Sequence, residues 1–490
     1  MAKGFVSIVG AGIGDRDLIT LRGQRALEQA DVIIYDRLLD ETLLTPHQGR
    51  AELIFAGKEA SNHYLTQEET NQLVLQKALE GKRVVRLKGG DPYVFGRGGE
   101  EAELLSEAGI KFEVIPGITA GVAALLSAGI PATHRDASTS ISLITGHRKK
   151  GVREDFTVYG QLPGTLVFYM GLNNLQKITQ DLLLGGMNPD MPAAVIMKGG
   201  SPEQRVFTST LRDIAAQIQD QDFGSPSLIV FGEVIRYREV LNFFENRPLF
   251  GKKIAITRTR TQNSKLREVL GELGAQVYEM PVIELIPVNT QGLVDRIKRM
   301  DYGYLVLHSP FAAELFIEEY LKIRDIRDLK EVKICVLGEK TGEVFRRMGI
   351  KPDIMPERYI GDALVEALRG EIQKGEKLFL PHSNLTRKIL IEAYEEMAEL
   401  DALVVYENHR PESVAPLPDG LDYVLFTSAS TVDNFIQNYG AEALKGVKVI
   451  SIGPITSDAL RSHGLYPHRE AKRASLEDMI ENIKEDVECE

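Results

Sequence analysis

The sequence lacks the features that mark secreted, membrane-spanning and cysteine-stabilised proteins. Its two cysteines, Cys335 and Cys489, are too few for a disulfide framework or a cysteine-based metal site. No run of eighteen apolar residues occurs, so we expect no membrane-spanning helix. The first residues, MAKGFVSIVG, contain no basic region followed by a long apolar stretch, so we expect no signal peptide and a cytoplasmic location.

Basic residues are also in the minority. With 58 lysines and arginines against 70 acidic residues, the net charge is −12, which argues against broad nucleic-acid binding. It leaves room for a small anionic ligand, because the charge of the pocket itself decides such binding. The chain is too long for one ordinary core, and its 43% of hydrophobic residues fits a globular protein of about three or four compact units.

Short apolar, strand-like runs alternate with helical patterns along the whole chain. This alternation predicts an α/β architecture with largely parallel sheets. The runs are FVSIV, DVIIY, RVVRL, FEVIP, TLVFYM and AAVIM in the first half, and KIAIT, YLVLH, KICVL, KLFLP, ALVVY, YVLFT and KVISI in the second.

Polar segments rich in proline and glycine predict the domain boundaries. The segment NRPLFGKK, residues 246–253, is the predicted linker between a domain at 1–245 and a domain at 254–490. A weaker proline–glycine break divides the first domain into two lobes, about 1–115 and 116–245.

The second half repeats itself at offsets of about 115–125 residues, which predicts a duplicated α/β unit. We therefore expect two flavodoxin-like lobes, about 254–287 with 413–490 and about 288–412, and a ligand cleft between them. The matching pairs are 302–321 with 422–440, 332–350 with 447–465, and KKIAITRTRTQNSKLREVL with EKLFLPHSNLTRKILIEAY.

A glycine-rich turn follows the first predicted strand. In VGAGIGD, Gly10, Gly12 and Gly14 let a ligand approach the backbone closely, next to the unpaired N–H groups of a helix start. The spacing is GxGxG rather than the dinucleotide-binding GxGxxG, yet Asp36 follows the second strand, where such folds keep a ribose-binding acid. A nicotinamide-dependent oxidoreductase with a non-catalytic second half, such as a periplasmic-type binding module, therefore stays open.

A second loop is more specific. The string RVVRLKGGDPYVFGRGGEE runs from a strand into Gly89, Gly90 and Asp91, and then into an acidic helix start. A nicotinamide-binding fold needs no second glycine-rich loop with an acid at its third strand. In the next segment, VIPGITAGVAALLSAGIP, Thr119 and Ala120 begin a helix of small residues that can pack closely against a ligand.

These motifs together resemble the tetrapyrrole methylase family, and within it the uroporphyrinogen-III C-methyltransferases. The resemblance covers residues 4 to about 245 and includes LRGQRALEQADVIIYDRLL, AGKE, STSISLITGH, TLVFYMG and SPEQRV. It implies S-adenosylmethionine as methyl donor, S-adenosylhomocysteine as its product, no metal, and a homodimer formed through this half. A methylase for a later corrin intermediate is the alternative, which the YDRL and GGDPYVFGRGGEE strings fit less well.

Carried over residue by residue, the resemblance assigns donor-binding roles beside those of the glycine turn. It also makes Asp36 a proton acceptor and Lys58 a proton donor. Two positions depart from the family pattern, because Ile13 replaces a usual proline and Gly200 a usual threonine. The residues assigned to the donor are Ile13, Gly89, Gly90, Asp91, Val94, Thr119, Ala120, Met170 and Gly199.

Simpler explanations exist for several of these residues. Without the resemblance, Asp36 is equally expected as a helix cap, whereas Lys58 is more often a solvated surface lysine and Met170 is usually a core residue. The many carboxylates of such a substrate favour arginine partners in bidentate pairs. The candidate arginines beside the motifs are Arg22, Arg37, Arg97 and Arg148.

The second half offers no convincing nucleophile–base pair, metal-ligand cluster or phosphate loop. Small hydroxyl residues follow its predicted strands, where a parallel sheet has its ligand crevice, although most of them are better explained as helix N-caps and turn residues. The strings LPHSNLTRKIL, VVYENHRP, LFTSASTVDNF and SIGPITSDALRSHGL, in this order between about 250 and 485, resemble the uroporphyrinogen-III synthase family.

That resemblance implies closure of linear hydroxymethylbilane to uroporphyrinogen III, with inversion of the last pyrrole through an azafulvene and a spiro intermediate. The substrate supplies the reactivity, so the protein chiefly folds it, and Tyr406 is the candidate to assist loss of the hydroxyl. We expect a bifunctional enzyme whose first half then methylates C2 and C7, giving precorrin-2 for sirohaem or cobalamin synthesis. The candidates to bind the acid side chains are Ser309, Ser383, Asn384, Ser428 and Thr456.

Overall fold

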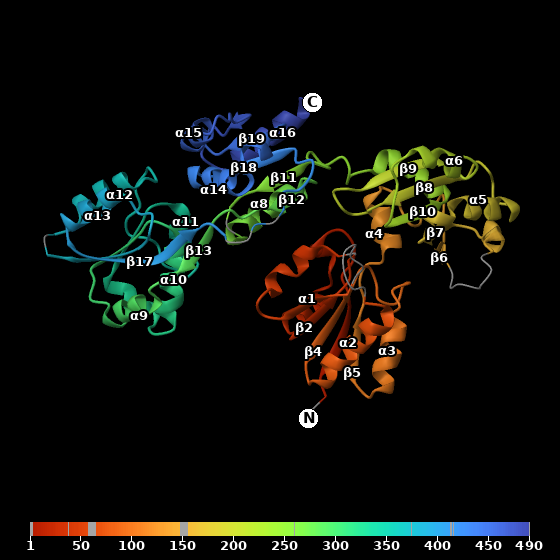
Figure 1. The fold of residues 1–490 in the computed structure, drawn as a ribbon, viewed down its shortest axis with the longest axis horizontal. Helices are drawn as coiled ribbons and strands as arrows, with labels where there is room; N and C mark the ends of the chain where they lie inside the picture. The colour runs from red at the N-terminus through yellow and green to blue at the C-terminus, as the bar shows by residue number, and fades with distance from the viewer. Residues whose placement is uncertain are drawn as a thin grey trace. The chain divides into compact units, whose positions relative to one another are not determined.

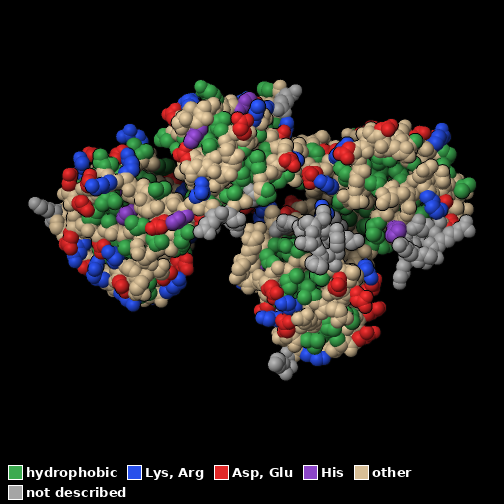
Figure 2. All heavy atoms as spheres, in the orientation of Figure 1, with side chains coloured by type: hydrophobic (Ala, Val, Ile, Leu, Met, Phe, Trp, Pro, Cys, Tyr) green, Lys and Arg blue, Asp and Glu red, His purple; other side chains and the backbone are tan. Residues whose placement is uncertain are grey.

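The structure is a computed structural model that describes residues 3–37, 39–56, 65–147, 155–258, 260–373, 375–411, 414 and 416–489 (Figure 1). Its contacts form two compact units. One comprises Met1–Lys253, Val269–Gln276 and Asp486–Glu490, and the other comprises Ile254–Glu268 and Val277–Glu485. None of the described helices has both the length and the apolarity that crossing a bilayer requires. Acidic and basic side chains are interspersed on the face shown in Figure 2.

The first sheet is entirely parallel, with the strand order β3-β2-β4-β1-β5. Helices α2 (Gln67–Leu79) and α3 (Gly98–Glu107) pack on one face and α1 (Leu21–Glu28) on the other. Because both faces are covered, the strands are rich in valine and isoleucine. They are β1 (Phe5–Gly10), β2 (Val32–Tyr35), β3 (Glu52–Phe55), β4 (Arg83–Lys88) and β5 (Lys111–Ile115).

The second sheet is mixed, with the order β6-β7-β10-β8-β9. The β6–β7 pair is parallel and the other three pairs are antiparallel. This sheet departs from the largely parallel arrangement expected. The β8–β9 pair is antiparallel because its connection is too short for a parallel crossover, and β10 runs antiparallel to both of its neighbours. Its elements are β6 (Ile141–Thr145), β7 (Thr165–Tyr169), β8 (Pro192–Met197), β9 (Arg205–Thr210), β10 (Ser227–Phe231), α4 (Ala120–Ser127), α5 (Leu175–Leu184), α6 (Ile214–Gln217) and α7 (Arg238–Leu241).

The third sheet has the order β12-β11-β18-β19-β20, which is the 2-1-3-4-5 order of flavodoxin-like folds. Its elements are β11 (Lys253–Ile256), β12 (Gln276–Glu279), β18 (Tyr423–Phe426), β19 (Lys448–Ser451), β20 (Arg469–Glu470), α8 (Arg260–Glu272), α14 (Ala429–Tyr439), α15 (Pro454–Ser462) and α16 (Leu476–Glu488).

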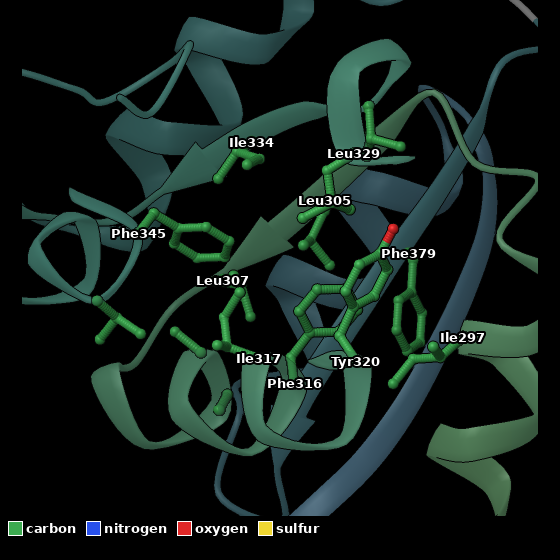
Figure 3. Close-up of a cluster of buried hydrophobic side chains, with 14 of the residues drawn as sticks. Ile297, Leu305, Leu307, Phe316, Ile317, Tyr320, Leu329, Ile334, Phe345 and Phe379 are labelled. Carbon is green, nitrogen blue, oxygen red and sulfur yellow. The ribbon is translucent and has the colours of Figure 1, made fainter. Parts of the chain in front are cut away.

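The fourth sheet has the order β13-β17-β16-β14-β15 and is covered on both faces. On one face, Phe316 and Tyr320 of α10 lie against Leu305 and Phe379 (Figure 3). On the other face Tyr394 of α13 is fully buried. Burying each such side chain contributes about 1.5–3 kcal/mol. The elements are β13 (Glu284–Pro287), β14 (Tyr304–Leu307), β15 (Lys333–Val336), β16 (Lys377–Ser383), β17 (Glu399–His409), α9 (Thr290–Arg299), α10 (Pro310–Leu321), α11 (Glu339–Arg346), α12 (Gly361–Arg369) and α13 (Lys388–Glu395).

The duplication predicted from the sequence is present, with an exchange of strands. Strands β11, β12, β14 and β15 of the first copy correspond to β16, β17, β18 and β19 of the second. The third sheet combines β11 and β12 with β18 and β19, and the fourth sheet combines the remaining strands, so each sheet needs both copies. Strand β13, which the predicted boundary placed with the third sheet, pairs with β17 in the fourth sheet.

Candidate functional site

Three loops of the first sheet touch through glycine residues. Gly10 ends β1, Gly90 follows β4 and Gly117 follows β5. Gly12 N donates to Gly90 O at 3.2 Å, and Gly90 N donates to Gly12 O at 2.7 Å. A Cβ atom at Gly10 would lie 2.5 Å from Gly117 N, and one at Gly117 would lie 2.2 Å from Gly90 O. Since only glycine permits three backbones to approach so closely, the predicted residues Gly10, Gly12 and Gly90 form one backbone cradle.

The same turn reaches the loop after β8 of the second sheet. A Cβ atom at Gly14 would lie 2.1 Å from Gly200 O, and one at Gly199 would lie 2.4 Å from Ala124 Cβ. The side chain of Ile13 comes to 3.6 Å from the Cβ position of Gly200. Gly200 has a φ of +79°, which glycine adopts freely and threonine does not. Gly200, which stands where the family usually has threonine, therefore suits this backbone conformation.

Asp91 joins two of the loops. Its Oδ2 accepts from Gly117 N at 3.2 Å, and its Oδ1 accepts from Tyr93 N at 2.8 Å. Each carboxylate oxygen keeps a further acceptor position, so Asp91 can also bind a ligand. Gly89 lies in the same loop, directly after β4. The structure thus places both residues in the cradle, and their contact with a methyl donor stays a prediction.

Thr119 contacts Tyr169, a residue that the sequence did not single out. The Tyr169 hydroxyl lies 2.7 Å from Thr119 Oγ1 and accepts from Gly121 N at 2.5 Å. Burial raises the pKa of Tyr169, so its phenol is protonated at neutral pH. The signal for it was its position in TLVFYM, at the end of a strand that leads to the site.

The other predicted donor contacts surround this pair. Ile13, Val94 and Ala120 pack against the same buried cluster, to which Tyr169 belongs. Met170 has a φ of 55° and is 57% exposed, so the alternative prediction that it is a core residue is wrong. The structure therefore brings the predicted donor-binding residues of both sheets to one region.

A buried charge network lies next to the cradle. Glu101 Oε1 accepts from Arg86 Nε at 3.2 Å, from Lys88 Nζ at 2.8 Å and from Gln67 Nε2 at 2.9 Å. Arg86 Nη2 also donates to Asp36 Oδ1 at 2.5 Å. Arg86, Lys88 and Glu101 are each 3% exposed. Burial lowers the pKa of Lys88, and the positive charge of Arg86 adds to that effect.

Asp36 is thus an ion-pair partner of Arg86 rather than the helix cap that the sequence also allowed. Among the described residues, no donor contacts Asp36 Oδ2, so this oxygen is open to a ligand. Sequence reasoning missed Arg86, Lys88 and Glu101. Their signal was the pair of cations inside RVVRLK, a strand whose other central residues are apolar.

Arg22 lies away from the cradle. It pairs with Glu113 and lines a cavity of about 220 Å³ together with Arg25 and Arg83. Phe5 and Arg83, the first residues of β1 and β4, also line this cavity, whereas the glycine loops follow the opposite ends of these strands. The structure therefore does not bring Arg22 to the predicted donor site.

The remaining charged candidates are exposed or lie outside the described residues. Arg97 pairs with Glu100 on the surface, and Arg37 is exposed directly after Asp36. Lys58 and Arg148 lie outside the described residues. Within the described part of the chain, no group of three or more His, Cys, Asp or Glu side chains could hold a metal ion.

In the fourth sheet, two predicted residues meet near the carboxyl ends of the strands. Tyr406 of β17 donates from its hydroxyl to Ser309 Oγ at 2.9 Å, across the intervening strand β16. Ser309 Oγ also accepts from Ala312 N at 3.1 Å, as N-cap of α10. Ser383 ends β16, and Asn384 Oδ1 accepts from a backbone N–H of β17 at 3.0 Å. The structure therefore gathers Ser309, Ser383, Asn384 and Tyr406 at one sheet edge.

Two histidines at this edge were missed from the sequence. His308 Nε2 lies 2.8 Å from Tyr394 OH, and His382 Nδ1 lies 2.9 Å from Ser383 O. Burial lowers the pKa of His308 to about 4 and also lowers the pKa of His382. Both rings are therefore neutral at pH 7. Their signal was that each histidine directly precedes a candidate serine at a strand end.

The other two candidates lie in the third sheet's part of the fold. Ser428 caps α14, where its Oγ accepts from Thr431 N at 3.3 Å. Thr456 lies in the first turn of α15 and is 3% exposed. Ser428 corresponds in the repeat to Ser309, but its neighbouring hydroxyl is Ser430, at 3.0 Å, instead of a tyrosine.

Two family models match the chain. The model of the tetrapyrrole (corrin/porphyrin) methylases matches residues 6–215, and the model of uroporphyrinogen-III synthase HemD matches residues 264–481. Among solved structures, the native form of uroporphyrin III C-methyl transferase from Thermus thermophilus is 37% identical. It covers 48% of this chain and 99% of that chain, with a TM-score of 0.42.

Two relatives match at the level of sequence. The uroporphyrinogen-III C-methyltransferase of Bacillus subtilis (strain 168) is 42% identical over 296 residues, which cover 59% of this chain and 61% of that protein. The porphyrin biosynthesis protein HemD of Ruminiclostridium josui is 36% identical over 498 residues, which cover 99% of this chain and 98% of that protein. The chain therefore belongs to the porphyrin biosynthesis proteins in which a tetrapyrrole methylase is fused to a uroporphyrinogen-III synthase.

Proposed function

We propose that this chain makes precorrin-2 from hydroxymethylbilane in two successive reactions. The second half closes hydroxymethylbilane to uroporphyrinogen III with inversion of the last pyrrole, and the first half methylates this product at C2 and C7. The observation that carries the proposal is the full-length similarity to a porphyrin biosynthesis protein, with a methylase match and a synthase match in separate halves. The product of one half is then the substrate of the other.

S-adenosylmethionine is the methyl donor in this proposal. When bound, it supplies a methyl group activated by a positively charged sulfur. The cradle fits such a group, because Gly90 has a φ of +67°, which favours glycine, and presents bare backbone at a place where a Cβ atom would already be in van der Waals contact with Ala120 N at 3.7 Å. Asp91 supplies a carboxylate for the positive charge of the donor, and the hydroxyl of Thr119 supplies a polar contact.

Asp36 is the proposed proton acceptor for the methylated ring. Arg86 fixes Asp36 Oδ1, so the carboxylate is held in one orientation with Oδ2 open to take a proton. A positioned base of this kind contributes about 10²–10⁴-fold to a rate. The role of Lys58 as proton donor stays a prediction from the sequence.

The synthase half needs no strong acid or base in this proposal. Loss of the hydroxyl from hydroxymethylbilane makes the substrate itself electrophilic, so the protein gains most by holding it in the folded geometry. Hydroxyl groups and neutral imidazoles at the edge of the fourth sheet suit this task. Ser383 at this edge, and Ser428 and Thr456 in the third sheet's part of the fold, are the proposed contacts for the acid side chains.

The test uses the purified full-length chain with hydroxymethylbilane and S-adenosylmethionine. Chromatography should show dimethylated product without any added synthase. In Asp36→Asn we expect methylation to fall about 100-fold while binding of S-adenosylhomocysteine persists. A chain that yields only the spontaneous type I isomer contradicts the synthase half, and wild-type methylation by Asp36→Asn contradicts the role of Asp36.

Four further properties remain predictions from the sequence. They are a cytoplasmic location, a homodimer through the methyltransferase half, independence of metal ions, and no binding of nucleic acid. Analytical ultracentrifugation of the chain at several concentrations tests the dimer directly.

A further inference from the structure

Ser309 uses both of its acceptor positions inside the protein. A serine hydroxyl has two acceptor lone pairs and one O–H. Ala312 N donates to Ser309 Oγ at 3.1 Å, and the Tyr406 hydroxyl donates to it at 2.9 Å. The serine O–H must therefore point away from both donors. No acceptor for it occurs among the described residues, so it is free to bind a ligand.

Tyr406 and Ser309 differ in what they expose. Tyr406 is 7% exposed, and its ring is held by an edge contact with Phe311 at 5.1 Å between ring centroids. Ser309 is only partly buried and lies at the strand end. The proton of the tyrosine is engaged inside the protein, whereas the proton of the serine is available at the edge of the sheet.

We propose that Ser309 donates the hydrogen bond to the departing hydroxyl of hydroxymethylbilane, and that Tyr406 is a positioning residue that acts through Ser309. This inference rests on the synthase function proposed above. It moves the direct contact from Tyr406, where the resemblance puts it, to the serine that Tyr406 orients.

The step balances without a co-reactant. The C–O bond of the hydroxymethyl group breaks with its electron pair on oxygen, while the electron pair of the pyrrole nitrogen forms the azafulvene. The pyrrole N–H proton ends on the departing oxygen, so water is lost. Ser309 keeps its own proton and stabilises the charge that develops on oxygen, as a donor of an oxyanion hole does. The two hydrogen bonds that Ser309 accepts polarise its O–H and strengthen it as a donor.

The chain offers a matched control for each hydroxyl. Ser475 Oγ accepts from Asp478 N at 3.1 Å, which equals the distance of the N-cap bond of Ser309. Tyr304 OH donates to Glu371 O at 2.9 Å from the amino end of β14, which equals the distance of the bond from Tyr406 to Ser309. Ser475→Ala therefore removes an equivalent bond without touching Ser309. Tyr304→Phe removes an equivalent donated bond, together with the bond that Tyr304 OH accepts from Lys333 Nζ at 3.3 Å, and it does not touch Ser309 either.

The experiment measures synthase turnover and the ratio of type III to type I isomer in full-length variants. Methylation of added uroporphyrinogen III by the same chains reports on the intact first half. Ser309→Ala should lower kcat about 100-fold with KM within about twofold, and Tyr406→Phe should lower kcat about 10-fold. The double variant should lose no more than Ser309→Ala alone, because Tyr406 acts through Ser309.

Three variants separate this role from a structural one. Ser309→Thr keeps both the cap and the O–H, so we expect a kcat within about fivefold of wild type. The controls Ser475→Ala and Tyr304→Phe should keep the wild-type kcat. If Ser309→Ala does not fold, Tyr406→Phe carries the test, and an unchanged kcat then overturns the proposal.

Three results would overturn the inference. They are a wild-type kcat in Ser309→Ala, a double variant whose loss is the product of the single losses, and an equal loss in both control variants. A wild-type chain that yields only type I isomer contradicts the proposed synthase function instead, so the two failures are distinguishable.

Discussion

Each half has a candidate site near the carboxyl ends of strands in an α/β sheet. The site of the first half contains Gly10, Gly90 and Gly117, and the site of the second half contains Ser309 and Tyr406. The first group forms a cradle in which backbones approach because side chains are missing. The second group forms a site in which the hydroxyl of Tyr406 on β17 and that of Ser309 after β14 form a hydrogen bond across the intervening strand β16. We therefore expect the first site to be damaged by a substitution that adds a methyl group to a glycine. We expect the second site to be damaged by a substitution that removes one hydroxyl oxygen.

Buried charge distinguishes the two regions as well. The first half buries Arg86, Lys88 and Glu101 beside its cradle, whereas the edge of the fourth sheet has His308 and Tyr394 in neutral form. A buried charge that loses its partner costs several kcal/mol, and a buried neutral group costs less. We therefore expect the first half to be the more sensitive to loss of one buried partner.

The largest effect on stability should come from Glu101→Gln. The change leaves Lys88 and Arg86 buried beside a neutral amide, which should destabilise the first unit by about 3 kcal/mol. Urea unfolding followed by circular dichroism measures the difference. Glu100→Gln, the neighbouring residue, removes an exposed pair with Arg97 and should cost about 0.5 kcal/mol or less. Equal losses in both variants would contradict the buried network.

A smaller effect is expected for Gly10→Ala. The new Cβ atom would lie 2.5 Å from Gly117 N and 2.7 Å from Gly90 O, and backbone has little freedom to give way. Overpacking of this kind costs about 1–3 kcal/mol. Because the strain falls on the backbone of the proposed donor site, we expect the affinity for S-adenosylhomocysteine to fall about 10–100-fold, as measured by calorimetry. Gly99→Ala is the control, because nothing lies within 4 Å of its Cβ position. Unchanged affinity in Gly10→Ala would remove Gly10 from the donor site.

The cradle was predictable from the sequence because it depends on one residue type, glycine, at particular positions. Glycines placed directly after apolar strands indicate where backbones approach, as Gly10, Gly12, Gly14 and Gly90 do, and the resemblance added Gly199. Their contact with a methyl donor stays a prediction. The charge network was missed, because one strand gives no indication which helix supplies the counter-charge for Arg86 and Lys88. That partner, Glu101, comes from α3 and is identified only by three-dimensional contact.

The second half was predictable in a different respect. Three matching segments indicated the duplication, and the predicted lobes, about 254–287 with 413–490 and about 288–412, already combined segments from both copies, as an exchange of strands requires. The predicted boundary placed β13 with the third sheet, whereas β13 pairs with β17 in the fourth. The contact between Ser309 and Tyr406 depends on that exchange, because β14 belongs to the first copy and β17 to the second. The histidines were missed because their one indication in the sequence is the candidate serine that follows each of them, and this position alone does not predict a role.

The smallest expected effect is a change of stability with pH. It tests whether the edge of the fourth sheet is neutral, in contrast to the charged network of the first half. His308 has a pKa of about 4 in the folded chain against an ordinary value of 6.5, chiefly because it is buried. Between these values the unfolded chain binds a proton that the folded chain does not, so acid favours unfolding. Lowering the pH from 7.5 to 6 should therefore cost the second unit roughly 1 kcal/mol through His308.

Calorimetry of the wild type and of His308→Gln at both pH values measures this contribution. The variant should show the smaller loss of stability on acidification, although His382, whose pKa is also lowered, keeps part of the slope. The ¹³C-histidine resonance that disappears in His308→Gln should not titrate above pH 5 in the wild type. A resonance that titrates near 6.5 would show that His308 is charged in the folded chain at mildly acidic pH, and the contrast with the charged network of the first half would then be lost.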